Sequence, residues 1–80
     1  MNGWCVFVHE DAQVLAINYS LEENMTCDGR LSFDKKTQAI TVLELSHSAT
    51  KTQTEQFICS VRGRIRRGFE FNKRYYLPVG

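Results

Sequence analysis

The spacing of apolar residues in this 80-residue chain changes near Ser46. Before Ser46, the apolar residues fall in short runs with a period of two, which is the spacing of β-strands. After it, Phe57, Val61 and Ile65 recur at four-residue intervals, which is the spacing along one face of an α-helix. A run of strands followed by one helix predicts a fold of the α+β class.

Two hairpins are predicted before Ser46. Residues 4–9 are rich in β-branched and aromatic side chains and are apolar on both faces, so we expect a strand inside the sheet. Residues 12–19 form its hairpin partner after a short polar turn. Residues 31–33 and 39–45 form the second hairpin around a turn at 34–37, so the first half of the chain supplies four strands.

Two local features of the second hairpin lead to further expectations. Gly29, which follows Asp28, is expected to supply the positive φ of a tight turn. The most apolar phase then shifts from Ile40 and Val42 to Leu43 and Leu45, a pattern that predicts either a β-bulge or a strand covered on both sides.

The helix is expected over residues 53–67. Thr52, with Glu55 three residues later, matches a capping box, and Gly68 is a typical residue for a helix end. The stripe that should face the sheet comprises Thr54, Phe57, Ile58, Val61 and Ile65.

A last strand is expected within residues 69–79, where apolar residues alternate again. Pro78 places it at a sheet edge or at the fraying end of the sheet, because proline cannot donate to the ladder. The prediction is a single α+β domain over residues 1–80, with a mainly antiparallel sheet of four to five strands and one amphipathic helix on one face, in the order β-β-β-β-α-β.

The sequence gives little support to catalysis. Cys5, Cys27 and Cys59 are too widely spaced for a zinc site and odd in number, so we expect free thiols, no metal and no cofactor. Cys27 and Asp28, with His47 after the next strand, form the only thiol and base combination that a hairpin could bring together. The expectation is a protein that is not an enzyme.

Charge is distributed unevenly along the chain. Residues 1–50 carry three basic and seven acidic side chains, a net charge of −4, whereas residues 51–80 carry seven basic and two acidic side chains, a net charge of +5. Part of this basic charge caps and solvates the helix end, because the arginines surround it on the helical wheel. The remainder provides a candidate binding surface made of Arg62, Arg64, Arg66, Arg67, Lys73, Arg74, Tyr75 and Tyr76.

Two partner classes fit this set of residues. The first is an acidic protein or a second copy of the chain, bound by the basic helix end and the C-terminal strand, which describes a small interaction module. The alternative is nucleic acid, with guanidinium groups on phosphates and Tyr75 or Tyr76 stacked on unpaired bases.

Residues 19–37 carry the turn Cys27-Asp28-Gly29, the strand Leu31-Ser32-Phe33 and the turn Asp34-Lys35-Lys36-Thr37. This segment resembles short uncharacterised bacterial proteins of Gram-positive and phage-related genomes. The resemblance implies a small bacterial protein and transfers no catalytic or binding residues. No apolar run approaches the roughly 20 residues of a membrane span and the first residues do not read as a secretion signal, so we expect a cytoplasmic location with no membrane partner.

Overall fold

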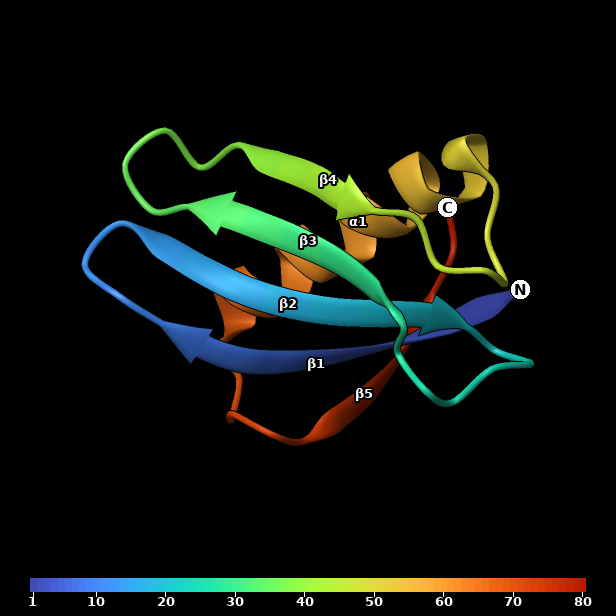
Figure 1. Cartoon of the computed structure of the whole chain (residues 1–80). Helices are drawn as coiled ribbons and strands as arrows, with labels where there is room; N and C mark the ends of the chain where they lie inside the picture. The colour runs from blue at the N-terminus through green and yellow to red at the C-terminus, as the bar shows by residue number, and fades with distance from the viewer.

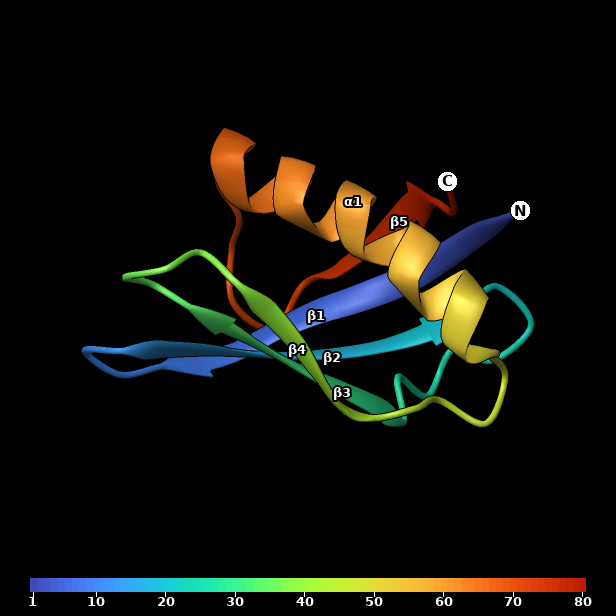
Figure 2. The same cartoon turned by 90° about the horizontal axis from the view of Figure 1, so that it is seen from above.

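Five strands form one antiparallel sheet, and a single helix crosses one of its faces (Figures 1 and 2). The computed structural model describes all 80 residues. Its elements are β1 (Asn2–Glu10), β2 (Val14–Leu21), β3 (Gly29–Asp34), β4 (Ile40–Glu44), α1 (Lys51–Arg67) and β5 (Arg74–Pro78). The strand order is β4-β3-β2-β1-β5, so the predicted α+β class and element order are confirmed.

The predicted positions in the sheet are also confirmed for β1 and β5. β1 is paired on both sides, with β2 and β5, whereas β5 lies at the edge as Pro78 indicates. In β1, Cys5 and Phe7 are fully buried on the face that α1 covers. Trp4 and Val6 alternate with them and lie half-buried on the opposite face. The apolar residues on the two faces of β1 therefore differ in their surroundings, because α1 covers only one face.

The core lies between α1 and the sheet. Its nine buried residues are Cys5, Phe7, Leu15, Ile17, Tyr19, Leu31, Phe57, Val61 and Leu77. Ile58 and Ile65 pack against this cluster, so the predicted helix stripe faces the sheet. Burial of these side chains is the main stabilising contribution to the fold.

β4 contains the bulge that the shift in its apolar phase suggested. Leu31 pairs with Val42, but Arg30 pairs with Glu44, so Leu43 is the extra residue. The Leu43 side chain is 54% exposed, which excludes a strand covered on both sides at this point.

The predicted capping box is wrong by two residues. The N-cap is Thr50, whose hydroxyl accepts a hydrogen bond from the Gln53 backbone N–H (3.1 Å), while the Gln53 side-chain oxygen accepts from the Thr50 N–H (3.0 Å). Both Thr50 and Thr52 satisfy the local pattern. A helix that starts after Thr50 also lets the buried Thr54 hydroxyl donate to the Thr50 carbonyl oxygen (2.9 Å), a contact that favours the earlier start.

The expected role of Gly29 also needs correction. The positive φ near this turn belongs to Cys27 (51°), whereas Gly29 is the first residue of β3. A Cβ atom at Gly29 would lie 2.3 Å from the Tyr19 ring and 2.8 Å from the Ser46 backbone nitrogen. Glycine is therefore needed here because the neighbouring groups leave no room for a side chain.

The last strand is shorter than expected. Asn72 has a positive φ of 62°, so β5 begins only at Arg74. Before it, Phe69 stacks on Phe7 with ring centroids 4.1 Å apart, and Phe71 forms a single parallel bridge to Phe7. Phe69 therefore extends the core beyond the helix, whereas Phe71 stays 41% exposed, and neither residue lengthens the strand.

Candidate interaction surfaces

The structure divides the predicted binding residues between two surfaces. Four of them lie in the last two turns of α1, and we call this group the basic end: Arg62, Arg64, Arg66 and Arg67. Arg74 and Tyr76 pair with Val6 and Trp4 of β1, so they lie on the sheet face opposite α1. We call this uncovered side the open face; it is turned toward the viewer in Figure 1, and Figure 2 shows it bare below the sheet.

Two arginines of the basic end are held by backbone carbonyl oxygens, and one of them also lies over an aromatic ring. The Arg62 guanidinium donates to the Gln38 carbonyl oxygen in the β3–β4 turn. Arg64 donates from Nε to the Gly68 carbonyl oxygen (3.0 Å), and its guanidinium carbon lies 5.0 Å from the centre of the Tyr75 ring. Lys73 Nζ lies 5.3 Å from the same ring centre, so Tyr75 joins Lys73 to the basic end.

No arginine of the basic end is in an ion pair. The three ion pairs of the chain are Lys35–Glu10 (2.6 Å), Lys73–Glu70 (3.4 Å) and His47–Asp28 (3.7 Å). The positive charge of the four guanidinium groups is therefore not neutralised by a direct carboxylate contact within the chain.

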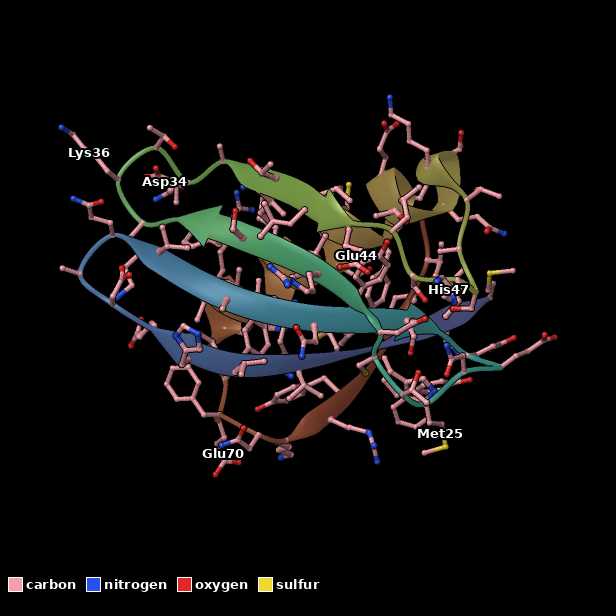
Figure 3. The ribbon with its side chains drawn as sticks, in the orientation of Figure 1. Met25, Asp34, Lys36, Glu44, His47 and Glu70 are labelled. Atoms are coloured by element: carbon pink, nitrogen blue, oxygen red, sulfur yellow. The ribbon has the colours of Figure 1, made fainter.

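Two aspartates accept backbone hydrogen bonds within the hairpin turns. Asp34 accepts hydrogen bonds from the backbone N–H groups of Thr37 and Lys36 (both 2.9 Å), and these bonds lower the pKa of its carboxyl group. Asp11 accepts in the same way from Gln13 and Val14 (both 2.7 Å), which lowers its pKa as well. Lys36 extends from the tip of its hairpin, away from the sheet (Figure 3), so this turn presents a cation to solvent.

The two neighbouring tyrosines have different environments. The Tyr75 ring packs edge-on against Phe7 (5.9 Å between centroids), and its hydroxyl oxygen accepts from the Glu70 backbone N–H (2.8 Å). With Arg64 and Lys73 against the ring as well, Tyr75 offers no free face for stacking. Tyr76 is 50% exposed and lies against Trp4 with ring centroids 4.5 Å apart.

A shallow hollow of about 430 Å³ lies on the open face. Ala16 and Ser32, two small side chains that pair across β2 and β3, form part of its floor. Val8, Val14, Arg30 and Leu43 are among the residues around them. Trp4 and Arg30 were missed as surface residues by the sequence analysis, because only the pairing register shows that they share a face with Arg74 and Tyr76.

Two of the three thiols, Cys5 and Cys27, are buried, whereas Cys59 is exposed. Burial raises the pKa of Cys5 to about 12 and also raises the pKa of Cys27, so both are protonated at neutral pH. The turn does bring Asp28 close to His47, but the Cys27 sulfur contacts the Ser20 hydroxyl (3.8 Å) and stays a buried thiol. A protonated thiol is a poor nucleophile, so this combination does not form an activated cysteine.

No three His, Cys, Asp or Glu side chains come together in a way that could hold a metal ion. The helix is too short and too polar to cross a bilayer. No family model, curated protein sequence or solved structure matches the chain.

Proposed function

We propose that this chain is a small, non-catalytic interaction module of the cytoplasm, which binds an acidic protein partner through its basic end. The observation that carries the proposal is the absence of any ion pair to Arg62, Arg64, Arg66 or Arg67. Four guanidinium groups within two helical turns repel one another, and a carboxylate-rich partner relieves this repulsion.

The chemistry of the basic end suits carboxylates. A guanidinium group can donate two parallel hydrogen bonds to one carboxylate, which adds geometric specificity to the attraction between the charges. Arg64 is held by Gly68 and Tyr75, so less side-chain entropy is lost when it binds.

An exposed apolar side chain in the segment between α1 and β5 is also available for contact. Phe71 is 41% exposed and packs edge-on against Phe69, with centroids 5.3 Å apart. Aromatic side chains are among the residues that contribute most to protein–protein affinity. We expect Phe71 to supply this contact in the complex.

A second copy of the chain is the other acidic partner that the charges allow. Glu23 and Glu44 are exposed and in no ion pair, and they belong to the acidic first half of the sequence. A dimer of this kind would pair the basic end of one copy with these carboxylates of another. Light scattering at low and high salt distinguishes this case, because a self-associating chain shows a mass that falls toward 9.2 kDa as salt screens the charges.

Nucleic acid is less well supported than a protein partner at the basic end. Stacking on bases needs an exposed aromatic face near the cations. The Tyr75 ring already contacts the Arg64 guanidinium, and its hydroxyl oxygen already accepts a hydrogen bond. Tyr76 lies on the opposite side of the sheet. The basic end therefore offers charge without a stacking platform.

Polyglutamate is a suitable probe for this proposal. We expect it to bind the native chain at about 50 mM salt and to be released at high salt, because exposed charges are screened within about 10 Å at 0.1 M. A triple variant, Arg62→Gln with Arg66→Gln and Arg67→Gln, should lose most of this binding.

The matched control removes the same charge elsewhere, as Arg30→Gln with Lys51→Gln and Arg74→Gln. It should retain most of the binding to polyglutamate. Equal losses in both triple variants would mean that net charge alone governs binding, and the basic end would no longer be a specific surface.

A further inference from the structure

The open face has a row of side chains that crosses the whole sheet. The pairing register places Arg74, Val6, Asn18, Arg30 and Glu44 next to one another on the five strands. Neither Arg30 nor Arg74 is in an ion pair. Because neighbouring strands are about 4.8 Å apart, the two arginines stand about 14 Å apart at their Cα atoms.

An aromatic platform lies one row away from these arginines. Trp4 and Tyr76 are packed together, and both are tied to Glu22. The Tyr76 hydroxyl donates to the Glu22 carboxylate (2.9 Å), and the Trp4 indole N–H lies 3.4 Å from the Glu22 carbonyl oxygen. The Tyr76 ring is half exposed, so an aromatic surface is held in place and is open to a ligand.

The acidic side chains near this face either lie at its margins or accept hydrogen bonds from other residues of the chain. Glu44 lies on the edge strand β4, and Glu70 lies in the segment that leads into β5 (Figure 3). The Glu22 carboxylate is held by Tyr76 and by the Asn2 backbone N–H (3.2 Å), and the Asp34 carboxylate closes a turn. Between Arg30 and Arg74 the row holds only the neutral Val6 and Asn18, whereas the Glu22 carboxylate keeps its negative charge beside the aromatic pair.

We infer that the open face binds single-stranded nucleic acid, with Trp4 and Tyr76 stacking on a base and Arg30 and Arg74 contacting phosphates. Aromatic side chains beside a positively charged groove are the combination that binds single strands without strict sequence preference. A duplex keeps its bases stacked on one another, so it cannot use the aromatic pair. This binding surface is separate from the basic end, and it extends the module from one partner to two.

Trp4 makes the inference directly measurable, because it is the only tryptophan of the chain. We expect an oligothymidylate of about 12 nucleotides to quench Trp4 fluorescence, with an affinity that falls as salt rises. A blunt duplex of the same length should quench much less. Tyr76→Ala should weaken binding of the single strand by about tenfold or more, which is the effect of losing one stacked base.

Three further variants separate the aromatic and charge contributions. Tyr76→Phe keeps the ring and should retain most of the binding, while Arg74→Gln and Arg30→Gln should each weaken binding and reduce its salt dependence. Circular dichroism of each variant shows whether it is folded. Arg30, Arg74 and Tyr76 are all exposed, so we expect each variant to fold.

Two results would overturn the inference. One is the absence of quenching by the oligothymidylate at about 50 mM salt. The other is binding that the triple variant of the basic end abolishes and that Tyr76→Ala, Arg74→Gln and Arg30→Gln leave unchanged. Polyglutamate binding reports on the basic end alone, so this inference and the proposed function can fail separately.

Discussion

Tyr19 joins three parts of the molecule through one hydroxyl group. Its Oη lies 2.7 Å from Thr54 Oγ1 on α1 and accepts from the Ser46 backbone N–H (3.1 Å) in the segment after β4. Tyr19, Ser46 and Thr54 are all buried. Tyr19→Phe should lower the free energy of unfolding by about 1–3 kcal/mol, because it leaves the Ser46 N–H without its partner away from water. Urea unfolding measures this change, and an unaltered midpoint would mean that water replaces the hydroxyl group.

Glycine positions differ in how much space surrounds them. Gly29→Ala should destabilise the chain by about 1–3 kcal/mol or more, because its Cβ would overlap the Tyr19 ring and the Ser46 backbone. Gly63→Ala is the control: the nearest atom to its Cβ is the flexible end of Arg67 (3.2 Å), and alanine is favoured over glycine in a helix by about 1 kcal/mol. Thermal unfolding should rank Gly63→Ala at or above the native chain and Gly29→Ala well below it.

At the scale of elements, the start of α1 provides a matched pair of threonines. Thr50→Ala removes the N-cap and should cost about 1 kcal/mol of stability, whereas Thr52→Ala, inside the first turn, should cost much less. Chemical denaturation of both variants tests the assignment. A larger loss for Thr52→Ala would restore the later helix start that local sequence suggests.

The turns between strands should make the fold sensitive to acid. Asp11, Asp28 and Asp34 all accept hydrogen bonds that lower the pKa of their carboxyl groups in the folded state. The stabilisation is thus present above the unfolded pKa of about 4 and is lost as pH falls through the lower folded values. The urea midpoint should be nearly constant from about pH 7 to pH 5 and should then decrease.

Asp34→Asn tests the contribution of one turn. The asparagine side-chain oxygen can still accept from the Lys36 and Thr37 N–H groups, but it does not titrate. The variant should fold at neutral pH and lose less stability than the native chain on acidification. An identical acid profile would show that this carboxylate is not linked to folding.

Element types were predictable from the sequence because apolar periodicity reports burial directly. The helix stripe follows from the positions of apolar residues alone, whereas the phase shift in β4 predicted either a bulge or a strand covered on both sides, and the structure has the bulge. The steric role of Gly29 was not predictable, because it depends on Tyr19 and Ser46, which are not its neighbours in the sequence. The cap at Thr50 was not predictable, because Thr52 fits the local pattern as well, and only the structure shows that Thr54 is buried against Tyr19. Where a local pattern fits two positions equally well, tertiary contacts such as these decide which position is used.

On the scale of the whole molecule, the candidate site was predicted only in part. The sequence shows an excess of basic residues after residue 50, but it does not show that they divide between two surfaces. Tyr75 and Tyr76 illustrate the reason: consecutive strand residues point to opposite faces, so only the register with β1 assigns Tyr76 and Arg74 to the open face. Trp4 and Arg30 join them there through pairings that no local pattern reveals.

Amide chemical shifts of the 15N-labelled chain test the division into two binding surfaces most directly. We predict that polyglutamate perturbs residues 62–71 and leaves the centre of β1 and β2 unchanged, while the oligothymidylate perturbs Trp4, Val6, Asn18, Arg30 and Tyr76. Perturbation of the same residues by both probes, or of residues scattered over the whole chain, would contradict the account.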